Sequence, residues 1–224
     1  MRLTQVMIAD NIISIKEELP LGTRLVAVSK FPSAEAIMEA YSAGQRLFGE
    51  NRPQELSAKA PVLPKDIEWH FIGHLQTNKL KMVLPYAALV QSIDSVHLLD
   101  AVNGWCLKEG VVKDILLELH LGAEQTKHGL MEDELLSVLS NLDKYPGVRV
   151  CGLMGMATNT DDESLIRADF KRISDLFRRI KDSFPSLESF TELSIGMSDD
   201  YRIALEYGAT IIRVGTSVFG PREY

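Results

Sequence analysis

The feature that most constrains the fold is a regular alternation of short apolar runs with amphipathic stretches. Many of the apolar runs end in Gly, Asn, Asp or Ser, which are residues that end strands. The runs cover residues 24–29, 46–49, 67–72, 88–93, 114–120, 149–154, 190–194 and 210–214. Strands that alternate with helices in this way predict parallel βαβ units.

The stretches between these runs carry apolar residues at helical spacing. They cover residues 34–43, 76–84, 96–108, 132–142, 163–181 and 199–207, and an opening helix is expected at residues 3–19. Right-handed crossovers between parallel strands allow an open doubly wound sheet or a closed barrel. Eight strands without a Gly-x-Gly-x-x-Gly motif after the first favour the barrel. The sequence predicts an α/β fold, a single (β/α)8 TIM-type barrel with an extra N-terminal helix.

Length and composition limit the number of domains and the class of partner. The chain has 224 residues, of which 46% are hydrophobic, which is enough for one sizeable core. Residues 1–224 are therefore expected to form one barrel domain. The net charge of −7 argues against nucleic acid as a partner. The basic residues Arg172, Arg178, Arg179 and Lys181 fit the solvated face of an amphipathic helix. No apolar run is long enough to span a membrane, and residues 1–19 lack the apolar core of a secretory signal, so a cytoplasmic protein is expected.

The two cysteines do not indicate a disulfide framework or a metal site. Cys106 falls in an expected helix and Cys151 in an expected strand. Both are expected to serve as small buried hydrophobes.

A lysine follows the first expected strand, on its core-facing side. Val26, Val28 and Lys30 share one face of an extended chain because strand side chains alternate. In barrels of this type the chemistry takes place where strands end and helices begin. A desolvated amine at that position is a good nucleophile toward aldehydes. A surface lysine that merely follows a strand is the alternative interpretation.

Two glycine and hydroxyl turns follow the last two expected strands. They read Ser194-Ile-Gly-Met-Ser198 and Arg213-Val-Gly-Thr-Ser217. Gly196 and Gly215 allow close backbone approach, while Ser198 and Thr216 add hydroxyl donors. Since the loops after strands seven and eight commonly hold phosphate in such barrels, these turns predict a phosphate site.

Arg213 is the third indication of a ligand. It alternates with Ile211 and Gly215 and should therefore point into the barrel. A buried guanidinium needs an acceptor, and a carboxylate such as Glu50 or Glu192 would be one. The other acceptor is the nitrogen of a pyridine ring held between Lys30 and the phosphate turns. If the acceptor is this pyridine ring, the lysine, the two turns and the arginine together predict pyridoxal 5'-phosphate (PLP), bound to Lys30 as a Schiff base.

Six ordered motifs resemble those of a known family. They are Val26-Ala-Val-Ser-Lys30, Phe48-Gly-Glu-Asn51, Trp69-His-Phe-Ile-Gly-His-Leu-Gln-Thr-Asn-Lys79, Gly152-Leu-Met154, Gly196-Met-Ser-Asp-Asp-Tyr201, and Arg213-Val-Gly-Thr216 continuing to Phe219-Gly220. From about Leu25 onward the chain is similar to the pyridoxal phosphate homeostasis protein family, which is related to the barrel domain of alanine racemase. The resemblance implies Lys30 as the Schiff-base lysine, Arg213 opposite the pyridine nitrogen and Asn51 beside the ring. It also implies phosphate contacts from Ser194, Gly196, Met197, Ser198, Gly215 and Thr216.

The chain departs from the family pattern at two places. Phe31-Pro32 follows the lysine where relatives commonly continue with Thr-Lys, and His120 takes the position of a usual Asn in the fifth strand. These changes affect the expected surface around the lysine and leave the phosphate turns unchanged. His70 and His74, within the tryptophan motif, are interpreted as packing or hydrogen-bonding residues rather than catalytic ones.

The resemblance implies a PLP-binding protein that acts in PLP homeostasis and delivery, and indirectly in amino-acid homeostasis, without efficient turnover. PLP is the expected ligand, apo forms of PLP-dependent enzymes are the expected recipients, and a monomer is expected. One alternative is a PLP-dependent amino-acid racemase that uses Tyr41 or Tyr201 as a second base. A nucleotide- or sugar-phosphate-binding barrel with an unmodified Lys30 is the other.

Overall fold

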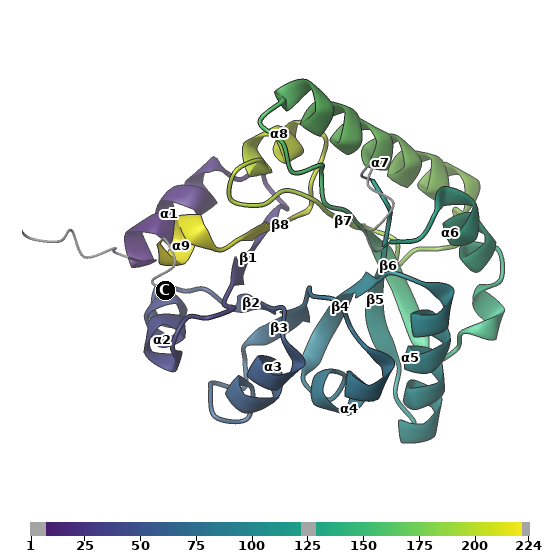
Figure 1. Cartoon of the computed structure of the whole chain (residues 1–224), viewed down its shortest axis with the longest axis horizontal. Coiled ribbons are helices and arrows are strands. Elements are labelled where there is room, and N and C mark those ends of the chain that lie inside the picture. Colours follow the sequence, from purple (N-terminus) through teal and green to yellow (C-terminus); the bar gives the residue numbers. More distant parts are fainter. Residues whose placement is uncertain (1–7, 122–128, 221–224) are drawn as a thin grey trace, which may run out of the picture.

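Eight parallel strands close into a barrel in which β1 pairs with both β2 and β8. The computed structural model describes residues 8–121 and 129–220 (Figure 1). The strands are β1 (Arg24–Val28), β2 (Leu47–Glu50), β3 (Glu68–Phe71), β4 (Ala87–Ile93), β5 (Lys113–Glu118), β6 (Val148–Met154), β7 (Glu192–Ser194) and β8 (Ile211–Val214). The expected barrel is confirmed, and each strand lies within the expected run or within about one residue of it.

Helices surround the barrel, and most of them begin shortly after a strand ends (Figure 1). They are α1 (Ile8–Glu18), α2 (Ala34–Ser42), α3 (Pro53–Lys59), α4 (Leu80–Val83), α5 (Val96–Glu109), α6 (Glu132–Leu139), α7 (Glu163–Ser183), α8 (Tyr201–Glu206) and α9 (Thr216–Phe219), with 3-10 turns at η1 (Thr77–Lys79) and η2 (Leu142–Lys144). The stretch expected as one helix at residues 76–84 is divided into η1 and α4. Neither α3 nor α9 is among the helices expected above, and residues 3–7 of the opening helix lie outside the described residues.

Side-chain capping starts two helices close to the ends of the strands before them. The hydroxyl of Ser33 accepts from the amide of Ala36 at 3.3 Å at the start of α2. The hydroxyl of Ser95 accepts from Leu98 at 3.2 Å at the start of α5, two residues after β4. Because the capping side chain satisfies a first amide of the helix, the helix can begin soon after the strand ends. The polar residues between strand and helix therefore stay at the barrel mouth.

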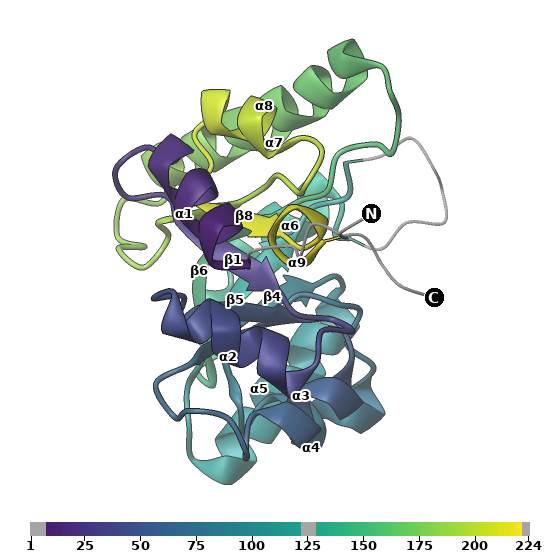
Figure 2. The same ribbon diagram turned by 90° about the vertical axis from the view of Figure 1, so that its left-hand side faces the viewer.

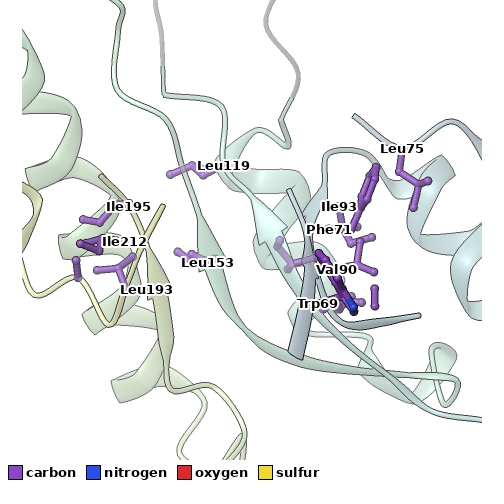
Figure 3. Close-up of a cluster of buried hydrophobic side chains, with 14 of the residues drawn as sticks. Trp69, Phe71, Leu75, Val90, Ile93, Leu119, Leu153, Leu193, Ile195 and Ile212 are labelled. Atoms are coloured by element: carbon purple, nitrogen blue, oxygen red, sulfur yellow. The ribbon is translucent and has the colours of Figure 1, made fainter. Parts of the chain in front are cut away.

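The main hydrophobic core lies between the strands and the surrounding helices. Figure 3 shows side chains of this core from β3, β4, β6, β7 and β8. Trp69, Phe71, Leu193 and Ile212 are all nearly inaccessible, and each is one residue from a side chain that faces the interior. This alternation follows from the two-residue period of a strand.

The barrel interior changes from apolar to polar toward the carboxyl ends of its strands. A separate cluster of Val26, Leu89, Leu116, Cys151, Met154 and Ile211 fills its centre. Two residues further along their strands lie the buried polar side chains Gln91, Glu118 and Arg213. The interior therefore has an apolar floor and a polar layer at the end where the helices begin.

The extra helix α1 packs against α2 and α9, and its last residue reaches α8 (Figures 1 and 2). Its Asn11 donates to the carbonyl of Val218 in α9 at 3.0 Å. Its Glu18 accepts from the hydroxyl of Tyr201 at 2.9 Å and pairs with Arg202 of α8. The helix thus ties the first described segment to the last strand–helix unit.

The cysteines and the basic residues of α7 lie where the sequence predicts them. Both cysteines are buried and free, and burial raises the pKa of each thiol. The basic residues of α7 (Arg172, Arg178, Arg179 and Lys181) are exposed. In the part of the chain that the structure describes, no helix is long and apolar enough to cross a membrane.

Gly152 provides a test of the barrel geometry. Its φ is +153°, and a Cβ atom built there would lie 1.8 Å from the carbonyl oxygen of Glu192 on the neighbouring strand. We expect Gly152→Ala to lower the free energy of unfolding by about 3 kcal/mol or more because backbone has to move. Urea unfolding followed by circular dichroism measures the change.

A matched glycine gives the opposite expectation. Gly104 lies on the exposed side of α5, and nothing lies within 4 Å of its built Cβ. Gly104→Ala should raise the free energy of unfolding by about 1 kcal/mol. Equal unfolding midpoints for the two variants would contradict the β6–β7 packing.

Candidate functional site

The residues singled out from the sequence gather at the carboxyl ends of β1, β2, β7 and β8. Lys30 follows β1, Asn51 follows β2, Ser194 ends β7 and Arg213 lies in β8. The turns with Gly196, Met197, Ser198, Gly215 and Thr216 follow β7 and β8. Because parallel strands end at the same side of the barrel, all nine residues lie around one mouth.

Lys30 lies in the short link between β1 and α2 and is half-buried. The amide of Ser29 donates to the carbonyl of Gly49 at 2.9 Å, which continues the pairing of β1 with β2 up to the lysine. Phe31 then has a φ of +79°, a left-handed conformation that costs a residue with a Cβ about 1–2 kcal/mol. Strained backbone next to a functional residue persists only where neighbouring contacts hold it.

Arg213 is buried inside the barrel and is held by neutral oxygens. Its Nη1 donates to the carbonyl and the hydroxyl of Ser194, both at 2.7 Å, and its Nη2 donates to the carbonyl of Gly155 at 2.9 Å. Burial lowers its pKa to about 10, and the nearby charges of Glu118 and Asp200 oppose that change. The guanidinium therefore stays charged near neutral pH.

The two carboxylates considered as partners of Arg213 pair with other residues. Glu50 bonds to Ser29 and Lys59, and Glu192 pairs with Arg24 at 2.8 Å. Within residues 8–121 and 129–220, no carboxylate forms an ion pair with Arg213, and its side-chain hydrogen bonds come from Nη1 and Nη2. The carboxylate alternative is therefore excluded for these two residues.

A chain of buried hydrogen bonds supports Arg213 from across the barrel. The hydroxyl of Ser194 accepts from Arg213 and donates to Oε1 of Gln91 at 2.6 Å. The amide nitrogen of Gln91 lies 2.8 Å from Nδ1 of His70. Burial, with a smaller contribution from the charge of Arg24, lowers the pKa of His70 to about 3, so the ring is neutral and Nδ1 accepts. The hydrogen-bonding interpretation of His70 is confirmed.

One backbone amide of the turn after β7 is already hydrogen-bonded to a side chain of the protein. The amide of Met197 donates to Oδ1 of Asp200 at 2.5 Å, and burial raises the pKa of that carboxyl. Gly196 has a φ of +91°, and a Cβ there would lie 2.7 Å from the methyl of Ala204 in α8. Close packing against α8 is therefore one reason for glycine at this position.

The turn after β8 is linked to the turn after β7. The amide of Gly215 donates to the hydroxyl of Ser198 at 3.2 Å. The first residues of α9, Thr216 and Ser217, have amides that no preceding helical carbonyl can accept. These amides and the exposed hydroxyl of Thr216 are the donors that the mouth offers to an anion.

Asn51 presents an unsatisfied acceptor. Its Oδ1 is buried and has no hydrogen-bond partner among the described residues. Asn51 follows β2 directly, and β2 lies on the opposite side of β1 from β8 and the turn that follows it. This mouth offers a lysine amine, a buried cation without a carboxylate, an unsatisfied amide oxygen and backbone amide donors. Such a set of groups fits a ligand that carries an aldehyde, an aromatic nitrogen and a phosphate.

A second polar group lies where β3, β4 and β5 end. His74 bonds through Nδ1 to Asp94 at 2.7 Å. Glu118, buried in the polar layer, has a pKa raised to about 7, first by burial and then by the charge of Asp94, while Arg213 and His74 oppose the rise. Sequence reasoning missed Glu118 and Gln91, although alternation with Leu116 and Leu89 places both inward.

Comparison with known proteins agrees with this geometry. A family model for the alanine racemase N-terminal domain matches residues 6–223. The chain is 36% identical over 202 residues to the pyridoxal phosphate homeostasis protein of Aquifex aeolicus, covering 90% of this chain and 88% of that protein. It is 37% identical over 220 residues to the protein of the same name from Homo sapiens, covering 92% and 80%.

Solved structures include PipY of Synechococcus elongatus with PLP bound, which has 36% identity and a TM-score of 0.87 over 95% of this chain and all of that chain. Alanine racemase of Bartonella henselae has a TM-score of 0.68 at 16% identity, covering 97% of this chain and 61% of that one. At that identity the likeness extends to the fold alone.

Glu118 makes the stability of the protein depend on pH. Its pKa is about 7 in the folded protein, whereas the ordinary pKa of a glutamate side chain is 4.5. Between these values the folded state keeps a proton that the unfolded state has lost, so stability should fall as the pH rises, by about 3 kcal/mol in all. Glu118→Gln should remove this dependence, as measured by urea unfolding from about pH 4.5 to about pH 8.

The exposed Glu39 of α2 provides the control for this measurement. Glu39→Gln should retain the full decline seen in the unmodified protein. An equally steep decline in Glu118→Gln would show that Glu118 is not the titrating group.

Proposed function

Because this chain belongs to the pyridoxal phosphate homeostasis protein family, we propose that it binds PLP covalently through the amine of Lys30 and acts in PLP homeostasis and delivery. One observation carries the proposal: closure of the barrel brings that amine, the buried Arg213 and the turns after β7 and β8 to one mouth. When bound, PLP supplies an electrophilic aldehyde to which an amine can add.

Arg213 would hold the nitrogen of the pyridine ring. A guanidinium does not release its proton near neutral pH, so it donates a hydrogen bond and leaves the ring nitrogen unprotonated. An unprotonated pyridine withdraws electrons weakly, which disfavours carbanion chemistry. The chain through Ser194, Gln91 and His70 would keep the guanidinium in place without neutralising its charge.

The phosphate would be held by the turns after β7 and β8. Ser198 and Thr216 supply hydroxyls, and the start of α9 supplies amide donors. Gly196, Met197 and Gly215 form the backbone of the two turns. We assign Ser194 a supporting role, because its hydroxyl already bonds to Arg213 and Gln91. Asn51 would lie beside the ring and offer its unsatisfied oxygen.

The role is that of a cofactor-binding protein and not of a racemase. The similar proteins of Aquifex aeolicus, Mus musculus and Homo sapiens are named for PLP homeostasis. The likeness to alanine racemases extends to the fold. Lys30 and Arg213 account for binding of the cofactor.

Three further features belong to the proposal. Apo forms of PLP-dependent enzymes are the proposed recipients of the cofactor. The protein is proposed to act as a monomer and in the cytoplasm. Transfer of PLP to an apo enzyme, and the mass of the protein in light scattering, test the first two of these.

The covalent site can be tested directly. Borohydride reduction of the protein with PLP, followed by peptide mass mapping, should place a pyridoxyl group on Lys30. Lys30→Ala should lose both this adduct and the visible absorption band that a Schiff base of PLP gives. It should keep its far-ultraviolet circular dichroism, because the residue is half-buried in a loop and outside the core. An adduct on Lys79 in place of Lys30 would contradict the assignment.

The phosphate turns predict a difference between two ligands. Thr216→Ala and Ser198→Ala should each weaken PLP binding by about 1–3 kcal/mol, the contribution of a hydrogen bond to a charged group. Pyridoxal, which lacks the phosphate, should bind unmodified protein much more weakly than PLP. Equilibrium dialysis measures both, and equal affinities for the two ligands would show that no phosphate site exists in these turns.

A further inference from the structure

Helix α3 holds the backbone on both sides of Lys30. The amine of Lys59 donates to the carbonyl of Ser29 at 2.8 Å, within the peptide that leads into Lys30. The carboxylate of Glu55 accepts from the amide of Phe31 at 3.1 Å, within the peptide that leaves Lys30. Glu55 and Lys59 are one helical turn apart and bond to each other at 2.9 Å.

The same amine also reaches the end of β2. Lys59 donates to Oε1 of Glu50 at 2.9 Å, and Ser29 donates to that oxygen at 2.7 Å. Lys59 thus has three acceptors for its three protons: Ser29, Glu50 and Glu55. An ammonium with all its protons bonded has one preferred position, so it ties α3 rigidly to the ends of β1 and β2.

Glu55 is held as an anion by its neighbours. Burial alone would raise its pKa, but the bonds from Lys59 and from the amide of Phe31, with the charge of Arg52, lower it overall. The guanidinium of Arg52 lies 3.5 Å from Glu55 and 4.7 Å from the centre of the Phe31 ring. Phe31 is therefore held through both its amide and its side chain in the left-handed conformation.

We propose that Glu55 and Lys59 are positioning residues for Lys30, an inference that rests on the proposed function. The backbone entering and leaving Lys30 determines the direction in which its side chain leaves the chain. Without the bond to Glu55, the strained Phe31 can relax to an ordinary negative φ, and that rotation turns the backbone next to Lys30. The pair would thereby keep the amine directed toward a ligand bound in the mouth.

Glu55 is the better residue to change. Glu50 is fully buried and depends on Lys59, so removal of Lys59 would leave a buried carboxylate without its cation. Glu55 retains 21% of its side-chain exposure. Glu55→Ala removes the acceptor for Phe31, whereas Glu55→Gln keeps an oxygen acceptor in the same place.

The experiment uses the full chain with PLP. The rate of pyridoxyl labelling at Lys30 is measured by borohydride trapping and peptide mapping, and visible circular dichroism of the bound cofactor reports its orientation. Glu55→Ala should slow labelling about tenfold and change the dichroism, as expected for a lost hydrogen bond to a charged group. Glu55→Gln should restore most of the rate.

Asp66→Ala is the matched control. Asp66 accepts hydrogen bonds from Tyr41 and Arg46 at the other end of the barrel. Its loss therefore removes surface hydrogen bonds comparable to those of Glu55, at a position remote from Lys30. This variant should label at the rate of the unmodified protein. Thermal unfolding of all variants establishes that each is folded during labelling.

The outcomes separate the two proposals. Labelling of the unmodified protein at Lys30 with an unchanged rate and dichroism in Glu55→Ala would overturn the positioning role and leave the proposed function intact. Equal slowing in Glu55→Ala and Asp66→Ala would also overturn it, because the effect would then be one of general stability. Absence of label at Lys30 in the unmodified protein would overturn both.

Discussion

The pairing of β1 with β8 is the constraint on which the rest of the site depends. Arg24 to Ala27 run in register with Ile211 to Val214, so the first strand of the chain lies beside the last. A Cβ built on Gly215 would lie in ordinary contact with Val28, 3.4 Å away and two residues before Lys30. Parallel pairing then brings the ends of both strands, and the turns that follow, to the same mouth. The packing of α1 against α9 reinforces the closure on the outside of the barrel.

Burial of a permanent cation gives this mouth its chemical character. Desolvating Arg213 is costly, and the protein compensates with two carbonyl groups and a hydroxyl in place of a carboxylate. Neutral partners satisfy hydrogen bonds but leave the charge available to a ligand. Glu118 and Asp200 are the nearby acids, and burial raises the pKa of both carboxyls, that of Glu118 to about 7. In the proposed function, this cation with neutral support would hold the nitrogen of the pyridine ring and leave it unprotonated.

Much of the fold could be predicted from periodicity, and the exceptions have identifiable causes. Helix α3 was missed because its sequence Pro53–Lys59 is short and mostly polar, with Leu56 its one buried residue. The stretch at residues 76–84 has a helical pattern but divides into η1 and α4. The inward position of Arg213 could be predicted because it follows from alternation with apolar neighbours along one strand, which depends on local geometry alone.

The partners of those residues could not be predicted in the same way. The family resemblance implied a phosphate contact for Ser194, but no local pattern predicted that its hydroxyl bonds to Gln91, which is 103 residues away in the chain. Such a contact depends on which strands face each other across a closed barrel. Charge pairing suggested Glu50 or Glu192 for Arg213, and both carboxylates have nearer cations, Lys59 and Arg24. The composition gives the number of charged residues but not which of them form ion pairs.

By itself, the sequence determined the class of fold, the lysine at the end of the first strand, the inward arginine and the pair of turns, because each is encoded within a few consecutive residues. The tertiary structure alone decided how Glu55 and Lys59 hold the backbone on both sides of Lys30, how Arg213 is supported, and why the pKa of Glu118 is raised. Those properties depend on distances between segments that are remote in the chain. Hydrogen bonds and desolvation act over a few ångströms in space, and only the closed barrel establishes which groups come that close.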